Sequence, residues 1–396
     1  MPAYRTLDDL KVDGRRVLVR GDLNVPMAQG QVSDATRLER LAPTLRELAD
    51  KGARVIVLSH FGRPKGERHP DMSLKSAAVA LGQVMDRDVT FADDCIGPTA
   101  EGVVNSLASG DIAVLENLRF HAGEEANAPD FAHDLSDLGD LYVNDAFSVA
   151  HRAHASTEQL AHLLPNAAGR QMQAELDALS AALDSPARPV AALVGGAKVS
   201  SKLDVLGHLV DKVDMIIIGG GMANTFLHAQ GVEVGASLHE PDLAETASAI
   251  LAKAESASCE IVLPIDAVVA SGLDDGANAQ TCVIDAVPHK KMILDIGPAS
   301  IAALESRLKK CKTIVWNGPL GAFEIKPFDV GTNRVAAAAA DLTVAGRLVS
   351  VAGGGDTVAA LNGADATERF TYVSTAGGAF LEWLEGKTLP GVKVLC

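Results

Sequence analysis

Val17-Leu18-Val19-Arg20-Gly21-Asp22-Leu23-Asn24-Val25-Pro26 sets the pattern from which the rest of the chain can be interpreted. The short run at 17–19 is rich in β-branched residues and predicts a strand, and the polar turn RGDLNVP follows it directly. Open α/β sheets bind ligands at the carboxyl ends of their strands, so Asp22 and Asn24 are candidates for hydrogen bonds to hydroxyl groups. The alternative is a polar turn that stabilises itself through side-chain to backbone hydrogen bonds.

Strand-like runs alternate with helical patterns along almost the whole chain. In the first half we expect strands near 17–19, 54–58, 89–91, 112–115 and 141–143. In the second half we expect them near 190–194, 215–218, 261–264, 313–316 and 348–351. One of the intervening helices should bury a single face, which carries Leu38, Leu41, Leu45 and Leu48. Repeated β-α-β units predict parallel strands with helices on both faces, and therefore an α/β protein of two doubly wound, Rossmann-like domains.

A long helical pattern at 170–184 ends in the sequence SPARP at 185–189, which breaks the helix before a buried strand begins. We interpret this segment as a stiff strut between domains. The expected division is an N-terminal domain at 1–169, an inter-domain helix and linker at 170–188, and a C-terminal domain at 189–374.

Composition excludes several classes of protein. The chain has 396 residues and a net charge of −16, so a nucleic-acid-binding surface is not expected. The N-terminal stretch has early acids and no apolar core, and no apolar run is long enough for a bilayer, so we expect neither a signal peptide nor a membrane partner. The five cysteines are scattered without a CxxC pair, which indicates reduced thiols and a cytoplasmic location.

Basic and amide groups follow four predicted strand ends in the first half, in the motifs RGDLNVP, SHFGRP, ENLRF and NDAFSVAHRAHA. Together with Arg37 they should form one anion-binding basin, because arginine forks grip a compact anion bidentately. Solvated surface loops are the alternative. His151 and His154 could also be zinc ligands, although such a site needs a third ligand and usually a helix or knuckle context; the alternative is a loop histidine pair beside an anion-binding arginine.

Glycine-rich turns dominate the second half, at 195–197, 219–221 and 353–355. Glycines that open a helix let backbone N–H groups approach a phosphate closely. Lys198 and Lys202 lie four apart on one helical face, Asp356 could bind Mg²⁺, and Glu324 could accept ribose hydroxyls. The alternatives are ordinary strand-to-helix turns, exposed lysines, a capping aspartate and a solvent-facing glutamate.

As an ordered set, the motifs resemble those of the phosphoglycerate kinase family from about Val12 to the end: RGDLNVP, SHFGRPKG, ENLRF, NDAFSVAHRAHAS, GGAKVSSK, IGGGMANTF, DIGPAS, WNGPLGAFE, GGGDT and STAGGAFLEWLEGKTLP. The resemblance implies a glycolytic kinase that reversibly transfers a phosphoryl group from 1,3-bisphosphoglycerate to Mg-ADP, giving 3-phosphoglycerate and ATP. It implies in-line transfer after hinge closure of two domains, Mg²⁺ bound with the nucleotide, and a monomer. It further implies that the tail at 375–396 packs back onto the N-terminal domain.

Matched motif by motif, the resemblance implies an acid-substrate site made of Asp22, Leu23, Asn24, Arg37, His60, Phe61, Gly62, Arg63, Arg119 and Arg152. It implies a nucleotide site made of Gly196, Lys198, Lys202, Gly220, Asn317, Pro319, Glu324, Gly353, Gly354, Gly355, Asp356 and Thr357, with Asp356 on the metal. The catalytic roles fall to Arg37, Lys198, Gly354 and Gly355. One departure is Ala376, which stands where the family usually has a third glycine.

Two other functions compete with this interpretation. A non-catalytic nucleotide-binding regulator on the same scaffold would be expected to have lost Arg37, Lys198 or Asp356, yet all three are present. Another carboxylate kinase, such as an amino-acid kinase, would need a site for an ammonium group and not five clustered basic motifs.

Overall fold

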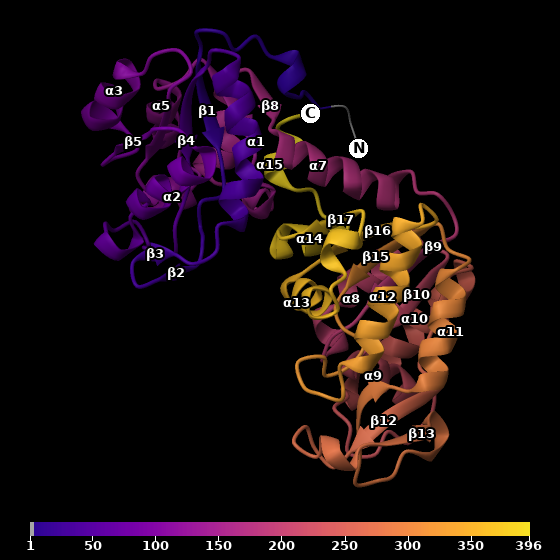
Figure 1. Cartoon of the computed structure of the whole chain (residues 1–396). Helices are drawn as coiled ribbons and strands as arrows, with labels where there is room; N and C mark the ends of the chain where they lie inside the picture. The colour runs from indigo at the N-terminus through magenta and orange to yellow at the C-terminus, as the bar shows by residue number, and fades with distance from the viewer. Residues whose placement is uncertain (1–3) are drawn as a thin grey trace. The chain divides into compact units, whose positions relative to one another are not determined.

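The computed structural model describes residues 4–396, and their contacts divide the chain into two compact units (Figure 1). The first unit runs to Leu176 and regains the chain at Thr388–Cys396. The second unit comprises Asp177–Lys387. None of the helices in the described part of the chain combines the length and apolarity needed to cross a membrane.

Six parallel strands form the sheet of the first unit, in the order β5 (Val89–Ala92), β6 (Ile112–Leu115), β4 (Arg54–Leu58), β1 (Arg16–Arg20), β7 (Leu141–Asn144) and β8 (Asn166–Ala168). The chain leaves β1 toward β4 and later returns to β7 on the other side of β1. The order of the strands therefore reverses beside β1, which is where open α/β sheets form a ligand crevice.

Alternating side chains of these strands build two separate cores. Val17 and Val19 pack with α1 (Thr36–Asp50) and α2 (Lys75–Met85). Leu18 belongs to the opposite core, with α3 (Gly97–Ser106) and α5 (Pro129–Ser136). The predicted apolar face of α1 is confirmed, since its four leucines are at most 1% exposed. Helices thus cover both faces of the sheet, as the β-α-β pattern predicts.

Several short elements of this unit connect these strands or follow them. They are the hairpin β2 (Met27–Ala28) and β3 (Gln31–Val32), the helices α4 (Ala122–Glu125), α6 (Leu160–Leu163) and α15 (Pro390–Lys393), and the turns η3 (Leu118–Phe120), η4 (Phe147–Val149) and η5 (Ala155–Gln159).

The sheet of the second unit also has six parallel strands, ordered β11 (Glu260–Val262), β10 (Met215–Ile218), β9 (Val190–Val194), β15 (Thr313–Asn317), β16 (Val349–Gly353) and β17 (Tyr372–Ser374). Numbered along this unit, the order is 3-2-1-4-5-6, that of the dinucleotide-binding fold. The predicted fold class of two doubly wound α/β sheets is therefore confirmed. The order reverses between β9 and β15.

Seven helices accompany this second sheet, namely α8 (Leu203–Leu209), α9 (Gly221–Ala229), α10 (Ala244–Ser256), α11 (Pro298–Leu308), α12 (Val330–Val344), α13 (Gly355–Gly363) and α14 (Gly377–Leu384). Helices α11 and α12 cover a core that contains Leu193, Ile314 and Trp316. The indole N–H of the buried Trp316 donates to the Gly318 carbonyl at 2.8 Å, so burial leaves no polar group of this side chain unsatisfied.

An antiparallel sheet between β11 and α11 was not predicted. It pairs β12 (Asp266–Ala270) with β13 (Gln280–Val283) and β14 (Met292–Ile296). The helix-strand alternation that predicts parallel sheets is interrupted here, because only short 3-10 turns, and no α-helix, connect the three strands. The edge strands β8 and β17 were also missed, because three-residue strands are too short to show a period.

The first turn of α7 (Arg170–Leu179) is anchored to the first unit. Asp145 accepts a hydrogen bond from the Met172 backbone at 3.0 Å, and Thr44 accepts one from the Arg170 backbone at 2.8 Å. The Arg170 guanidinium also pairs with Glu47 at 2.6 Å. The predicted helix continues as a wider turn over Ser180–Asp184.

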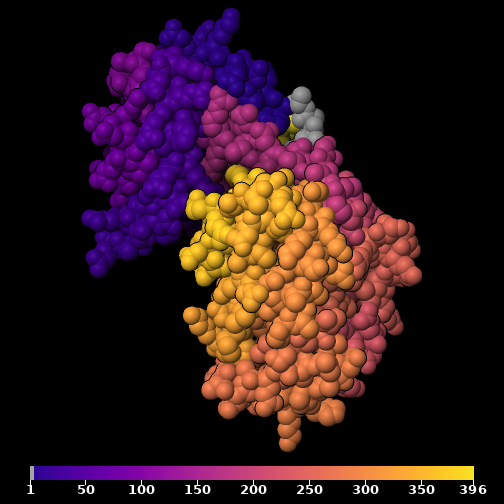
Figure 2. Space-filling model, turned by 45° about the vertical axis from the view of Figure 1, so that its right-hand side comes forward, coloured from indigo at the N-terminus to yellow at the C-terminus, as the bar shows by residue number. Residues whose placement is uncertain are grey.

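The C-terminal segment divides between the units. Helix α14 packs on α8 and β16, and the Phe380 ring lies against Gly353, where a Cβ would be only 2.6 Å from the ring. Figure 2 shows this segment, in yellow, at the surface of the second unit. Residues from Thr388 onward belong to the first unit, where Asn144 donates to the Gly391 carbonyl at 3.1 Å. The expected return of the whole segment 375–396 is thus limited to its last residues.

Candidate active site

Polar residues at the carboxyl ends of β1, β4, β6 and β7 meet at one edge of the first sheet. The Asn24 side chain accepts a hydrogen bond from the Gly62 backbone at 3.0 Å, and Arg119 donates to the Gly62 carbonyl at 2.7 Å. The Asn117 side chain, which follows β6, accepts a hydrogen bond from the Phe61 backbone at 3.1 Å. The structure therefore brings the predicted motifs together, because parallel strands deliver their carboxyl ends to one side.

Arg37 begins α1 beside the turn after β1. Its guanidinium donates to the Asn24 carbonyl at 2.7 Å and lies 3.2 Å from an oxygen of Asp22. Asp22 in turn accepts from the Ser148 hydroxyl at 2.6 Å, a contact that the sequence did not suggest. The Arg37 side chain is 35% exposed, so part of its fork remains accessible to a ligand.

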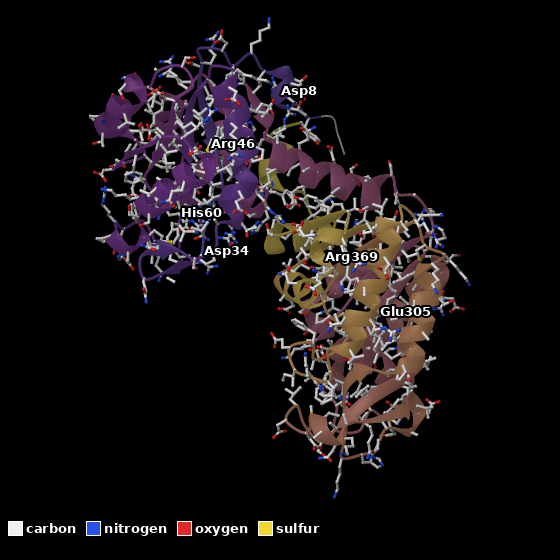
Figure 3. The ribbon with its side chains drawn as sticks, in the orientation of Figure 1. Asp8, Asp34, Arg46, His60, Glu305 and Arg369 are labelled. Atoms are coloured by element: carbon white, nitrogen blue, oxygen red, sulfur yellow. The ribbon has the colours of Figure 1, made fainter. Side chains whose placement is uncertain are left out.

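Burial and neighbouring cations control the protonation of the histidines. His60, marked in Figure 3, lies in the first unit with its pKa well below the usual value, first because it is buried and then because Arg20 and Arg119 are near. Burial likewise lowers the pKa of His154 to about 4. Both imidazoles are therefore neutral at physiological pH, and the positive charge of the basin resides in its arginines.

Three arginines of the first half differ in accessibility. Arg63 is exposed, and Arg152 is partly exposed and donates to His151 at 3.1 Å. Arg20, which the sequence grouped with the phosphate-binding arginines, is 0% exposed and cannot meet a ligand from solvent. The grouping fails for Arg20 because it lies on β1 itself, in the middle of the sheet.

The zinc alternative concerned His151 and His154. Within the described residues, the one group of three potential ligands that lie close together is Asp94, Cys95 and His121, and neither histidine belongs to it.

A cavity of about 350 Å³ opens at the point where the strand order of the second sheet reverses. Five residues assigned to the nucleotide line it, namely Gly196, Gly220, Pro319, Glu324 and Asp356. The opposite wall is apolar and includes Leu273, Met292, Leu294 and Phe323. Sequence reasoning missed this wall, since part of it comes from the unpredicted antiparallel sheet. An apolar wall facing polar glycine turns suits a flat base joined to a phosphorylated sugar.

The turn after β16 is built around backbone groups. Gly354 caps α13 with a φ of 104°, a conformation that favours glycine, and a Cβ there would lie 2.7 Å from the Asn317 amide nitrogen. That amide donates to the Gly353 carbonyl at 2.7 Å. No side chain caps the first turn of α13, so its N–H groups and the positive end of the helix dipole are available to an anion.

Two side chains add to this turn from its flanks. Thr357 accepts a hydrogen bond from the Gly318 backbone at 2.7 Å, which ties the turn to β15. Lys202 donates to the Asn317 side-chain oxygen. Burial lowers the pKa of the Lys202 ammonium, while the Asp356 carboxylate opposes the shift. Lys198 is exposed and directly precedes the short helical turn Val199–Ser201.

Asp356 has the chemistry expected of a Mg²⁺ ligand. Its carboxylate is exposed, belongs to the first turn of α13 and lines the cavity. Magnesium is a hard cation that binds one or two carboxylates together with substrate phosphates. A single carboxylate beside a site for phosphates therefore fits a metal that arrives with a nucleotide.

Ala376, the departure from the family pattern, precedes α14. Its φ is −93°, so the methyl group causes no left-handed strain. The neighbouring Gly377 lies beside the glycine turn, since a Cβ there would be 3.8 Å from the Gly355 nitrogen. The starts of α13 and α14 therefore lie next to each other.

Comparisons with known proteins agree with this architecture. A family model described as phosphoglycerate kinase matches residues 7–387. Phosphoglycerate kinase of Methylobacterium radiotolerans is 63% identical over 396 residues, with 100% of this chain and 99% of that protein covered. The protein of the same name from Rhizobium meliloti is 62% identical over 393 residues, with 99% and 98% covered.

Solved structures extend the similarity to three dimensions. Phosphoglycerate kinase from Coxiella burnetii matches with a TM-score of 0.92 at 40% identity, covering 99% of both chains. The enzyme from Pyrococcus horikoshii OT3 matches with a TM-score of 0.82 at 31% identity, covering 99% of this chain and 98% of that one. The chain therefore belongs to the phosphoglycerate kinase family.

Proposed function

We propose that this chain catalyses reversible phosphoryl transfer from 1,3-bisphosphoglycerate to Mg-ADP, which yields 3-phosphoglycerate and ATP in glycolysis. The observation that carries the proposal is the presence of two different anion-binding devices, each at the switch point of its own parallel sheet. The device in the first unit consists of side chains, and the device in the second consists largely of backbone. Two phosphorylated ligands of different size account for both.

In this proposal the first unit is the acid-binding domain. Arginine forks hold the phosphate and carboxylate of the substrate, while Asp22 and Asn24 serve its hydroxyl group. The remaining contacts come from the turns after β1, β4, β6 and β7, through Leu23, His60, Phe61, Gly62, Arg63, Arg119 and Arg152.

The second unit is the proposed nucleotide-binding domain. The apolar wall of its cavity takes the base, Glu324 takes the ribose, and the turn at 353–357 takes the phosphates. Asp356 would hold Mg²⁺, which neutralises phosphate charge when it is bound. Gly196, Lys198, Lys202, Gly220, Asn317 and Pro319 complete the site.

Phosphoryl transfer requires no covalent intermediate with the protein. The chain has to align donor and acceptor, exclude water and neutralise the oxygens of the moving group. We assign that neutralisation to Arg37, Lys198 and the N–H groups of Gly354 and Gly355. In-line transfer needs reacting atoms about 3–3.5 Å apart, so ligands held by separate domains must be brought together by hinge closure.

Small-angle scattering tests the closure. The radius of gyration should be smaller with 3-phosphoglycerate plus a Mg-nucleotide than in the free protein. An unchanged radius with both ligands at saturation would refute the hinge.

A coupled assay tests the activity. With 3-phosphoglycerate and ATP, formation of the acyl phosphate can be followed through its reduction. A regulator would bind ATP and show no turnover, and an amino-acid kinase would turn over only with an amino acid. Absence of activity with 3-phosphoglycerate would overturn the proposal.

A further inference from the structure

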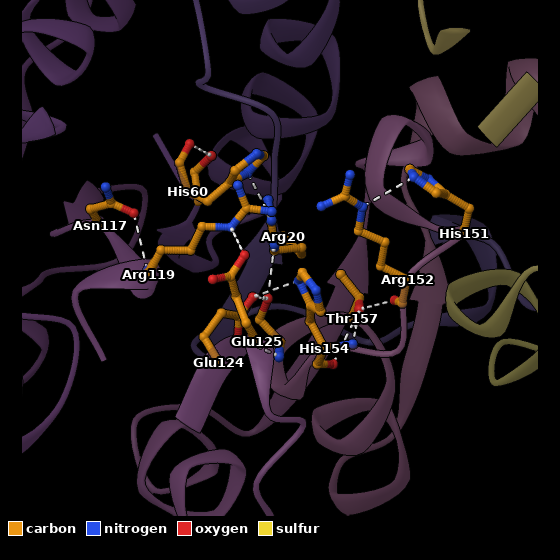
Figure 4. Close-up of polar contacts among 12 residues, drawn as sticks. Arg20, His60, Asn117, Arg119, Glu124, Glu125, His151, Arg152, His154 and Thr157 are labelled. Carbon is orange, nitrogen blue, oxygen red and sulfur yellow. Dashed lines mark hydrogen bonds and ion pairs between the residues drawn. The ribbon is translucent and has the colours of Figure 1, made fainter. Parts of the chain in front are cut away.

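A chain of hydrogen bonds runs beneath the proposed acid site, through four side chains that lie far apart in sequence (Figure 4). The Glu124 carboxylate accepts from the Ser156 hydroxyl at 2.6 Å and from the Ser156 backbone N–H at 2.9 Å. The same hydroxyl accepts from Arg20 Nε at 2.9 Å. At the far end of the guanidinium, Arg20 Nη2 lies 3.1 Å from His60 Nδ1.

The direction of each hydrogen bond follows from chemistry. A guanidinium has only donors, so Nδ1 of His60 has to be the acceptor of the last bond. The Ser156 hydroxyl accepts from Arg20 and therefore gives its single proton to Glu124. Arg20 is thus the donor at the centre of the chain: one run of hydrogen bonds leads from it through Ser156 to Glu124, and the other leads from it to His60.

Burial makes this arrangement rigid. Arg20, Glu124 and Ser156 are each 0% exposed, and His60 is 5% exposed. The Arg20 guanidinium also donates through Nη1 to the Gly21 carbonyl, so each of its three nitrogens has a hydrogen-bond partner. A buried charge left without a partner is costly, and here the cation and the carboxylate compensate each other through one shared hydroxyl.

The tautomer of His60 is a consequence. The imidazole is neutral, because burial and the neighbouring arginines lower its pKa. With Nδ1 occupied as an acceptor, its one proton resides on Nε2. A neutral imidazole with a fixed Nε2–H is a hydrogen-bond donor suited to a phosphate or carboxylate oxygen.

We propose that Glu124 and Ser156 are positioning residues which, through Arg20, hold His60 in the Nε2–H tautomer and thereby make it a hydrogen-bond donor to the acid substrate. The inference rests on the proposed function. It concerns residues that no ligand touches, since Glu124 and Ser156 are enclosed by protein.

The first experiment is nitrogen-15 NMR of the histidine rings in the ligand-free protein, with the His60 signals assigned from a His60→Asn variant. The wild-type protein should show an unprotonated Nδ1 and a protonated Nε2. Ser156→Ala keeps both buried charges and removes only the shared hydroxyl, so Arg20 loses one anchor and the two tautomers should mix. A wild-type His60 protonated on Nδ1 would overturn the proposal. This readout needs no turnover, so it remains valid even if the proposed activity is absent.

The second experiment is steady-state kinetics of Ser156→Ala and Glu124→Gln. The KM for 3-phosphoglycerate should rise about tenfold, in proportion to the loss of one hydrogen bond, while the KM for ATP stays within about twofold. Glu158→Gln is the matched control from the same helical turn. Its carboxylate pairs with Asn127 at 2.8 Å and with His162 at 2.9 Å, away from Arg20, so this variant should leave both constants unchanged. A Ser156→Ala protein with the wild-type tautomer would refute the mechanism, whatever its KM. So would a variant that raises both KM values equally, because that result indicates general damage.

Discussion

The two units solve the problem of binding phosphate in opposite ways. The first uses long side chains, whose charges are held by buried partners such as Asp22 beneath Arg37. The second uses backbone N–H groups at the start of α13, in a turn where a Cβ on Gly354 would lie 2.7 Å from the Asn317 amide nitrogen. A site made of side chains should fail when a charge is removed, whereas a site made of backbone should fail when a methyl group is added.

The two units also differ in what neutralises the negative charge of the ligand. Arginines bring full positive charges of their own to a compact anion. A helix N-terminus offers only partial charges, so the second site depends on a carboxylate and its metal to balance a polyphosphate. The predictions below test this contrast, beginning with the largest effect.

Arg37→Ala should be the most damaging change to catalysis. The proposed role of Arg37 is to neutralise the moving phosphoryl group, and loss of one transition-state donor typically lowers kcat by about 10²–10³. The KM for 3-phosphoglycerate should rise much less. Steady-state kinetics checks this, and a variant with near-normal kcat would remove Arg37 from the catalytic residues.

Asp145 should make the stability of the first unit depend on pH. Its carboxyl is fully buried at the start of α7, and burial raises its pKa to about 6 from an ordinary value of 3.8. Between about pH 4 and pH 6 the folded state therefore binds more protons than the unfolded state. The stability that the protonated Asp145 carboxyl contributes is present below about pH 4 and is lost as the pH rises to about 6. The expected loss is about 3 kcal/mol.

Thermal denaturation of wild type and Asp145→Asn at pH 4 and pH 7 measures this contribution. The asparagine cannot titrate but can still accept the helix-capping bond. The advantage of wild type over the variant should be greater at pH 4 than at pH 7. A constant difference would show that this aspartate does not titrate in the range.

Asp356→Asn should weaken the nucleotide site alone. The carboxylate is proposed to serve the metal, and hydrogen bonds or contacts that involve a charge contribute about 1.5–3 kcal/mol, which corresponds to roughly a 10- to 100-fold loss of Mg-nucleotide affinity. Titration calorimetry should show unchanged binding of 3-phosphoglycerate. Equal damage to both affinities would contradict the division of ligands between the units.

Gly354→Ala tests the backbone site with a single methyl group. The residue has a φ of 104° and a Cβ would lie 2.7 Å from Asn317, so the substitution should cost about 1–2 kcal/mol and reduce nucleotide affinity about tenfold. Gly363→Ala is the control in the same helix, since nothing lies within 4 Å of its Cβ position. The idea fails if the two variants bind Mg-ADP equally well.

Sequence reasoning located the strands that bear the motifs because their signals are local. The runs at 112–115, 190–194 and 215–218 coincide with β6, β9 and β10, since central strands of parallel sheets are continuous apolar segments. The glycines, arginines and acids of the sites follow these strands directly, so their common location at a sheet edge follows from parallel topology.

Other features depend on contacts between distant segments. The sequence could not show that Arg20 is buried, because its partners Ser156 and His60 lie 136 and 40 residues away. Nor could it show that α14 belongs to the second unit, or that an antiparallel sheet supplies an apolar wall to the cavity.

The amino-acid sequence by itself thus determined the two-sheet α/β class, the family, and which residue types stand at each strand end. Only the tertiary structure decided which of those residues remain accessible to a ligand and which are buried and position the others through hydrogen bonds. The physical reason is that secondary structure and turn chemistry depend on neighbours along the chain, whereas burial, pKa and hydrogen-bond direction depend on neighbours in space.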